Sequence, residues 1–301
     1  MAAAVAAANE VISFYSYTPV ADPEAHAAWQ RETGAQLALH GRVIVATEGV
    51  SGTASGSIAA TREYVSKLEA ALGIGLDRDG IEAALRATVE RNDMHDNVHV
   101  RLMITRGDKK TPSQHPSNNI GGPNIVIIAE HKAADPDIRD RGISLFTATV
   151  RRPAPDTLDQ KLNCHSKLHE VIALIQATSA GADEALMLDP TGAVATCNAT
   201  NFFIIDGDGL HTATGQYNLN GITSELVCEV AEAAGISVHQ HAFSLTDVYA
   251  ADEAFVTGTF GGLTPVHTID GRTIGTGEQG PMTIRLRELY EAAIEVDVAG
   301  R

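Results

Sequence analysis

The hydrophobic and polar positions divide the chain into short stretches with two different periods. Alternating or β-branched stretches predict strands at residues 11–15, 41–46, 99–104 and 124–128. Apolar residues at helical spacing predict helices at residues 22–39, 57–72, 81–92, 164–180, 222–234 and 281–295. Asp-Pro-Thr-Gly at 189–192 and Asp-Gly-Asp-Gly at 206–209 predict tight turns. The pattern predicts an α+β protein with a largely antiparallel, barrel-like sheet in its second half.

The first segment has the order strand, helix, strand, helix. A run of small residues, Gly49–Gly56, stands between the strand at 41–46 and the helix at 57–72. Such a run could bind phosphate, but it lacks the lysine of a Walker loop and the third glycine of a dinucleotide-binding loop. We therefore predict a structural turn there.

A polar, proline-bearing stretch at residues 106–123 predicts a long loop between two strands. Loops of this length are usually functional or mobile. We expect the part from Gly107 to Pro123 to overhang a substrate pocket and to influence specificity.

Composition narrows the class of protein. A chain of 301 residues is long enough for two domains. Its net charge of -16 and the lack of a basic run longer than Lys109-Lys110 argue against a nucleic-acid partner. Residues 1–9 lack the features of a secretion signal and no stretch has eighteen apolar residues, so we expect a cytoplasmic protein with no membrane partner. The wide spacing of Cys164, Cys197 and Cys228 predicts reduced thiols.

Lysine chemistry has few candidates in the second half of the chain. Only Lys161 and Lys167 occur after Lys132. A lysine that forms a Schiff base needs a partly buried amine with a lowered pKa, because the ammonium form is not nucleophilic. Lys161 stands at a predicted strand-to-helix junction and Lys167 within a predicted helix, so Lys161 is the better candidate. Spacing alone does not decide between a catalytic and a structural lysine.

The N-terminal residues resemble one known family. Phe14–Tyr17, Asp22–Glu24 and Glu48–Gly56 are similar to the N-terminal, ferredoxin-like domain of the rhodanese-related tRNA uridine hydroxylases. The resemblance covers residues 10 to about 75. The catalytic rhodanese domain of that family, with its cysteine loop, has no counterpart downstream, so its activity is not implied.

The rest of the chain, about residues 81–298, resembles the class IV aminotransferases of fold type IV, in particular branched-chain aminotransferases and (R)-amine transaminases. The resemblance is carried by ordered blocks: Asp96–Arg101, Lys161–Asn163, Asp183–Asp189, Thr200–Ile205, Leu219–Thr223, Ala251–Thr259 and Gly280–Thr283. It implies a barrel-like domain that binds pyridoxal 5'-phosphate. Together the two resemblances imply a tail at 1–9, a ferredoxin-like α/β sandwich at 10–78, the remainder of an aminotransferase small domain at 79–148, and a cofactor-binding large domain at 149–301.

The resemblance also implies roles for individual residues. Lys161 would carry the cofactor as a Schiff base and move the proton during catalysis. Leu219 would pack on the pyridine ring. The helix start at Gly221, Ile222 and Thr223 would bind the phosphate, because free N–H groups and the helix dipole favour an anion.

Four more residues complete the implied site. Thr259 and Phe260 would bind the same phosphate. Arg101 and Arg152 match positions near the substrate pocket, where each could bind a carboxylate or form a structural ion pair.

Two positions depart from the family pattern. The family places a glutamate against the pyridine nitrogen, and the matching residue here is Thr196. A hydroxyl can hydrogen-bond but cannot hold that nitrogen protonated, so we expect a less protonated ring. Residues 1–80 also lack the family's phosphate-binding arginine block. The chain thus resembles a chimera whose cofactor affinity is reduced.

These observations predict an aminotransferase that moves an amino group between an amino acid or (R)-amine and a 2-oxo acid. The alternatives are a pyridoxal-phosphate lyase similar to aminodeoxychorismate lyase, and a non-catalytic scaffold with an N-terminal interaction module. The family builds its active site at a dimer interface, which implies a homodimer. His165 and His169 stand one helical turn apart but have no third ligand, so we expect a helix surface and no metal.

Overall fold

The computed structural model describes most of the chain, and the structural statements below concern these residues. Besides Ala25, Trp29, Gln30, Glu32, Thr33 and Ile138, they are residues 9–16, 40–46, 49–57, 78–94, 98–104, 108–113, 115–122, 124–132, 141–160, 167–258 and 261–299.

The chain divides into two compact units, Glu10–Ala134 and, mainly, Asp135–Arg301. Strands and helices are mixed along the first unit. Its elements are β1 (Asn9–Ser16), β2 (His40–Ala46), β3 (Gly49–Ser57), α3 (Arg78–Arg91), β4 (Val98–Ile104), β5 (Asp108–Lys109), the 3-10 helix η1 (Pro116–Asn118), β6 (Asn119–Ile120) and β7 (Ile125–His131). The finer domain boundaries expected at residues 78 and 148 stay predictions.

The strands predicted in the first unit are confirmed, as is the helix at 81–92. The predicted turn at Gly49–Gly56 is wrong, because these residues form β3, which pairs antiparallel with β2 from His40↔Ser55 to Ala46↔Gly49. Glycine, serine and alanine have weak strand propensity, but pairing to a β-branched neighbour strand overrides it. The helices predicted at 22–39 and 57–72 fall almost entirely outside the described residues.

The predicted long loop at 106–123 contains a small hairpin. Strand β5 pairs antiparallel with β6 through Asp108↔Ile120 and Lys109↔Asn119. The strands that flank it, β4 and β7, pair antiparallel from Val98↔His131 to Ile104↔Ile125. A local hairpin of two residue pairs is too short to stand out from the polar sequence around it.

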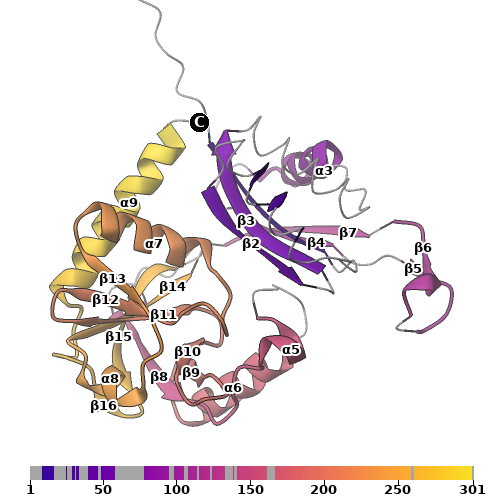
Figure 1. The fold of residues 1–301 in the computed structure, drawn as a ribbon. Coiled ribbons are helices and arrows are strands. Elements are labelled where there is room, and N and C mark those ends of the chain that lie inside the picture. The colour runs from indigo at the N-terminus through magenta and orange to yellow at the C-terminus, as the bar shows by residue number, and fades with distance from the viewer. Residues whose placement is uncertain are drawn as a thin grey trace, which may run out of the picture. The chain divides into compact units, whose positions relative to one another are not determined.

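The second unit is built on one large sheet (Figure 1). Its elements are β8 (Ile143–Thr147), α5 (Pro155–Leu158), α6 (Leu168–Ser179), β9 (Glu184–Leu188), β10 (Val194–Cys197), β11 (Asn201–Asp206), β12 (Gly209–Thr212), α7 (Ile222–Ala233), β13 (Ser237–Gln240), α8 (Leu245–Ala250), β14 (Glu253–Gly258), β15 (Gly262–Ile269), β16 (Arg272–Thr273) and α9 (Pro281–Ala299).

The nine strands follow the order β10-β9-β8-β15-β14-β11-β12-β13, with β16 paired to β15. The sheet is mixed, because β8 pairs parallel with β9 and with β15, and β12 pairs parallel with β13. The other described pairs are antiparallel. The predicted α+β class is therefore confirmed.

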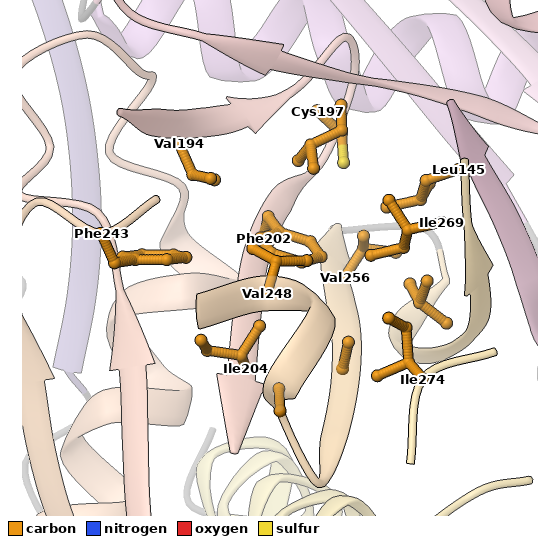
Figure 2. Close-up of a cluster of buried hydrophobic side chains, with 14 of the residues drawn as sticks. Leu145, Val194, Cys197, Phe202, Ile204, Phe243, Val248, Val256, Ile269 and Ile274 are labelled. Carbon is orange, nitrogen blue, oxygen red and sulfur yellow. The ribbon is translucent and has the colours of Figure 1, made fainter. Parts of the chain in front are cut away.

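The sheet has a hydrophobic core on each face, and β11 contributes to both. Phe202 and Ile204 join one cluster, which α8 covers, while Phe203 and Ile205 join another under α7 and α9. Successive side chains of a strand point to opposite faces, so an unbroken apolar run suits a strand that is covered on both sides. Figure 2 shows Phe202 at the centre of the first cluster, with side chains from several strands and from α8 around it.

The predicted turns are confirmed. Asp206 and Gly209 close the β11–β12 hairpin, and Gly207 within it has a φ of 58°. In the other turn the Asp189 carboxylate accepts hydrogen bonds from the Thr191 and Ala193 amides. Glycine and aspartate are the residues that such turns require, because one tolerates positive φ and the other bonds to nearby backbone.

Sequence reasoning missed the short helices α5 and α8. Helix α8 has a sequence signal nonetheless: Ser244 and Asp247 form a capping box, in which each side chain bonds to the other residue's amide. Six residues are too few to show helical periodicity, so only the cap could have revealed this helix.

A carboxylate from the sheet caps the N-terminus of helix α9. Glu253 of β14 is buried and accepts hydrogen bonds from the Met282 amide (2.9 Å), the Thr283 amide (2.8 Å) and the Thr283 hydroxyl (2.6 Å). A negative charge at a helix N-terminus is stabilised by the free amides and the helix dipole. The described helices include none that is both long and apolar enough to span a membrane.

Three histidines gather at the β12–β13 edge of the sheet. The rings of His211 and His239 stack with centroids 4.7 Å apart, and His211 Nδ1 lies 2.9 Å from His241 Nε2. Burial, followed by the charges that His239 and His241 can acquire, lowers the pKa of His211 below its ordinary value of 6.5. The cluster therefore favours the neutral form of His211 in the folded protein.

We expect this cluster to make the protein less stable in mild acid. The unfolded chain binds a proton at His211 near pH 6.5, and the folded chain binds it only at a lower pH, so the stability of the fold decreases as the pH drops through 6.5. The charges of Asp206 and Asp247 oppose this lowering of the His211 pKa. Chemical denaturation between about pH 7.5 and about pH 5.5 should show a larger loss for the wild type than for His211→Asn. Equal losses in the two proteins would contradict the expectation.

Candidate functional site

Four segments meet at one end of the sheet: the end of β10, the start of β11 that follows it, the loop before α7 and the end of β14. Asn201 at the start of β11 lies opposite Thr257 near the end of β14. The Asn201 side chain also donates a hydrogen bond to the Leu219 carbonyl (2.9 Å), and Asn218 donates one to the Ala195 carbonyl (3.1 Å). These contacts bring the neighbourhoods of the predicted residues Thr196, Leu219 and Gly221 together.

The N-terminus of α7 is free of a side-chain cap. Gly221 is the N-cap residue, and it has no side chain to hydrogen-bond to the first turn. The amides of the first turn of a helix have no partner within the helix, which makes them donors for an anion. Ile222 is about half exposed (48%) and Thr223 is buried. The start of α7 at Gly221, Ile222 and Thr223 therefore has no side-chain cap, and phosphate binding by these residues stays a prediction.

Glycine is required at position 221 by close packing. A Cβ atom there would lie 2.3 Å from Asn201 Oδ1, far inside van der Waals contact. Asn201 in turn holds the Leu219 carbonyl. The absence of a side chain at Gly221 thus lets β11 approach the start of α7.

Two buried polar atoms near this junction have no hydrogen-bond partner within the described residues, Asn218 Oδ1 and Thr257 Oγ1. The two residues are buried, with exposures of 5% and 1%. A buried polar atom without a partner costs free energy, so such atoms often mark a place where a ligand or water binds. Sequence reasoning missed both residues as site residues, although Asn218 lies next to a predicted block and Thr257 within one.

Thr196 is buried in β10, where its hydroxyl donates a hydrogen bond to the Thr200 carbonyl (2.7 Å). A hydroxyl has one hydrogen to donate, so toward a ligand Thr196 can only accept while this bond persists. The Thr200 hydroxyl donates to Glu184 (2.7 Å), and burial raises the pKa of that carboxyl. A carboxyl group is therefore present near Thr196, but on β9 and not at the position where the family has its glutamate.

Of the two candidate lysines, the structure describes only Lys167. Lys161, Thr259 and Phe260 lie outside the described residues, as does His165, so their predicted roles stay predictions. Lys167 is the N-cap residue of α6, and its Nζ lies 3.1 Å from Glu170 Oε2. The Lys167 side chain is therefore engaged in an ion pair with α6.

Arg152 is buried and bound to the protein itself. Its Nη1 donates to Glu170 (2.6 Å) and to Gln160 (2.8 Å), and its Nη2 donates to the Cys197 carbonyl (2.6 Å). Burial lowers the pKa of Arg152, and the charge of Glu170 opposes that shift. This geometry favours a structural role for Arg152 over binding of a substrate carboxylate.

The other predicted residues belong to other elements of the two units. Arg101 is exposed on β4 in the Glu10–Ala134 unit, and its contact with substrate stays a prediction. His169 Nε2 lies 2.9 Å from Gln160 Oε1. The blocks at 183–189 and 280–283 connect elements of the fold, because Asp183 accepts hydrogen bonds from the Ser144 amide and hydroxyl and the second block forms the capped start of α9.

Comparison with known protein families gives two matches. The family described as "Amino-transferase class IV" matches residues 64–269. The family described as "UPF0176 acylphosphatase like domain" matches residues 9–102. The second match agrees with the resemblance of the N-terminal residues to the rhodanese-related proteins.

Curated relatives match over most of this chain. "Branched-chain-amino-acid aminotransferase-like protein 2" of Arabidopsis thaliana is 40% identical, over 71% of this chain and 38% of its own length. "Branched-chain-amino-acid aminotransferase-like protein 1" of the same plant is 36% identical, over 80% of this chain and 44% of its own length. This chain thus spans about two fifths of these relatives. "Putative branched-chain-amino-acid aminotransferase" of Methanocaldococcus jannaschii is 34% identical, over 76% of this chain and 78% of its own length.

The fold also matches solved structures. The branched-chain amino acid aminotransferase of T.th. with pyridoxamine 5'-phosphate superposes with a TM-score of 0.68 and 30% identity, over 76% of this chain and 74% of the other. The same enzyme complexed with N-(5'-phosphopyridoxyl)-L-glutamate gives a TM-score of 0.66 and 30% identity, over 76% of this chain and 73% of the other.

We expect Gly221→Ala to weaken binding of pyridoxal phosphate. The added methyl group would displace Asn201 and with it the start of α7, and loss of one charge-assisted hydrogen bond corresponds to a weakening of roughly tenfold. Fluorescence titration of the cofactor measures the affinity. Gly122→Ala, at a glycine with open space around it, is the matched control; equal affinities in the two variants would contradict the assignment of the helix end.

Proposed function

This chain belongs to the class IV aminotransferase family, and on that premise we propose that it binds pyridoxal 5'-phosphate and transfers an amino group between an amino acid and a 2-oxo acid. The observation that carries the proposal is the junction of four segments, with an uncapped helix end and two unpartnered buried polar atoms among the described residues. These features fit a ligand that has both an anionic tail and a polar ring.

Different residues would contact different parts of the cofactor. The amides of Gly221, Ile222 and Thr223, together with Thr259 and Phe260, would hold the phosphate. Leu219 would contact a face of the ring; it is 37% exposed, so it is not committed to the protein core. The atoms nearest to a Cβ placed at Gly221, apart from its chain neighbours, belong to the neutral side chains of Asn201 and Ser224.

The ring nitrogen would face a neutral environment. Thr196 supplies a hydroxyl whose hydrogen is already donated to Thr200. Asn218, which hydrogen-bonds to the neighbouring Ala195 carbonyl, has an Oδ1 without a partner in the described part of the chain. Both groups are acceptors for a protonated nitrogen, and neither carries the charge that would hold it protonated. This supports the expectation of a less protonated ring than in family members with a glutamate.

Lys161 would hold the cofactor through its amine and move a proton to and from the substrate carbon. Once bound, pyridoxal phosphate supplies an electron sink for the carbanion that forms when that proton leaves. Lys167, the other lysine of this half, is paired with Glu170. Arg101 would bind the carboxylate of an amino-acid donor. The alternative donors are (R)-amines, and comparing activity with amino acids and with (R)-amines distinguishes the two.

We expect borohydride reduction of the cofactor-loaded protein to fix the cofactor on Lys161, and Lys161→Ala to lose both the fixed label and amino transfer from an amino acid to 2-oxoglutarate or pyruvate. Peptide mass spectrometry and product analysis measure the two. Lys167→Ala is the matched control and should keep the label. A label on Lys167 would overturn the assignment of Lys161 as the cofactor-binding lysine. Release of ammonia or pyruvate without amino transfer would indicate a lyase. If no residue carries the label, the proposal that the protein is an enzyme is wrong.

Helix α6 has an exposed apolar surface to which a second copy of this chain could bind. Four apolar residues, spaced one, three or four apart along that helix, are 40–72% exposed: Leu168, Val171, Ile172 and Ile175. Apolar residues at this spacing form one stripe on a helix, and exposed stripes of this kind often mark interfaces. The stripe supports the homodimer that the family resemblance implies. A cytoplasmic location stays a prediction from sequence.

We expect Val171→Glu to weaken the dimer by roughly tenfold or more, because a charge would be buried in an apolar interface. Analytical ultracentrifugation across a dilution series measures the dissociation constant. Val296→Glu introduces the same charge at an exposed valine on α9 and serves as the control. An unchanged dissociation constant for Val171→Glu would exclude this stripe as the interface.

A further inference from the structure

We propose that Asn201 is a positioning residue that fixes Leu219 and the start of α7 relative to each other at the end of the sheet. The inference rests on the proposed function, in which Leu219 contacts the cofactor ring and the first amides of α7 bind its phosphate. The sequence assigned no role to Asn201 itself, which stands within the block Thr200–Ile205.

The loop before α7 has few bonds to the sheet. Residues 213–220 belong to no helix or strand. Within the described part of the chain, two hydrogen bonds join this loop to the sheet, and both come from asparagine side chains. Asn201 donates to the Leu219 carbonyl (2.9 Å), and Asn218 donates to the Ala195 carbonyl (3.1 Å). No strand pairing holds the loop, so its position at Leu219 depends on these side-chain bonds.

The Asn201 side chain contacts the end of the loop at two points. Its Nδ2 donates to the Leu219 carbonyl. Its Oδ1 packs against Gly221, where an added Cβ would lie only 2.3 Å away. One planar amide therefore reaches from the residue that would contact the ring to the N-cap of the helix that would bind the phosphate. A change in this amide would shift the two parts relative to each other.

Strand pairing and both hydrophobic cores hold the backbone of Asn201. Asn201 is the first residue of β11 and pairs with Thr257 of β14. The next two residues, Phe202 and Phe203, are buried in the cores on the two faces of the sheet. Groups that bind a ligand keep their geometry when the residues behind them are fixed by packing and hydrogen bonds. Asn201 thus connects a fixed strand to a loop that has few bonds of its own.

The same contacts could serve folding alone, and two ligands separate the two roles. Pyridoxamine 5'-phosphate carries a ring and a phosphate, and it has an amine in place of the aldehyde, so it binds without a covalent bond to a lysine. Inorganic phosphate carries only the anionic part. A positioning Asn201 affects binding of ring and phosphate together much more than binding of phosphate alone.

Partial unfolding would not imitate this result. Both ligands bind only the folded protein, so a smaller folded fraction weakens both by the same factor. The ratio of their dissociation constants therefore reports the relative placement of the two binding parts and not the stability of the variant.

The experiment is a fluorescence titration of the full chain with pyridoxamine 5'-phosphate, followed by displacement with inorganic phosphate. Asn201→Leu keeps the approximate size of the side chain and removes both polar atoms. We expect the phosphate constant divided by the pyridoxamine phosphate constant to fall roughly tenfold in this variant, because the two parts of the ligand no longer meet their sites together.

Thr212→Val is the matched control. It removes a buried side-chain bond of similar length in the same sheet, from the Thr212 hydroxyl to the Phe202 carbonyl (2.8 Å). This variant should lower the melting temperature and leave the ratio of the two constants unchanged.

Each outcome decides the proposal. A wild-type ratio in Asn201→Leu, or an equal fall in Thr212→Val, overturns the positioning role and leaves the proposed function standing. A wild-type protein that binds pyridoxamine 5'-phosphate no more tightly than phosphate overturns the proposed function and this inference with it.

A second variant covers the case in which Asn201→Leu does not fold. Asn201→Asp keeps the shape of the side chain and loses the N–H that binds the Leu219 carbonyl. Its negative charge weakens both anionic ligands alike and so cancels in the ratio. A lowered ratio supports positioning, and a wild-type ratio overturns it.

Discussion

The candidate site depends on the pairing of β11 with β14. That pairing sets Asn201 opposite Thr257 and Phe203 opposite Phe255, whose rings stack with centroids 5.0 Å apart. Because side chains alternate along a strand, a shift by one residue would move each phenylalanine of β11 into the wrong core. The two hydrophobic cores therefore fix the register, and the register fixes which polar residues reach the end of the sheet.

The polar groups of the second unit follow a consistent division. Its buried or half-buried charged groups have partners within the protein: Glu253 at the start of α9, Asp270 with the Thr147 amide and the Tyr249 hydroxyl, and Arg152 with Glu170. The two atoms at the junction that lack a partner among the described residues, Asn218 Oδ1 and Thr257 Oγ1, are neutral. Leaving a neutral atom unpaired costs far less than leaving a buried charge unpaired. The fold can thus leave these two neutral atoms without a protein partner while its charges hold the elements together.

The chain combines two kinds of sequence. An acylphosphatase-like match at 9–102 overlaps the start of the aminotransferase match at 64–269, and residues 1–80 lack the phosphate-binding arginine block that the aminotransferase resemblance implies. A phosphate site built from helix amides, a threonine and a strand turn does not need that arginine for geometry, only for additional affinity. Under the proposed function, a threonine in place of the family's glutamate at Thr196 would change the charge on the ring and not the place where the ring binds.

Sequence by itself determined the class of fold, four of the strands, the longer described helices and the blocks that carry the family resemblance, because turn residues, helix starts and apolar periodicity are local properties of the chain. It left Arg152 open between a substrate carboxylate and a structural ion pair, and it assigned Gly49–Gly56 to a turn, because the local sequence around an arginine or a run of small residues does not show what they contact. Only the tertiary structure decided that Arg152 joins Gln160, Glu170 and Cys197, and that Asn218 and Thr257 each keep a polar atom without a partner among the described residues. These features arise where strands and helices distant in sequence meet, and pairing at a distance leaves no periodic trace in a single chain.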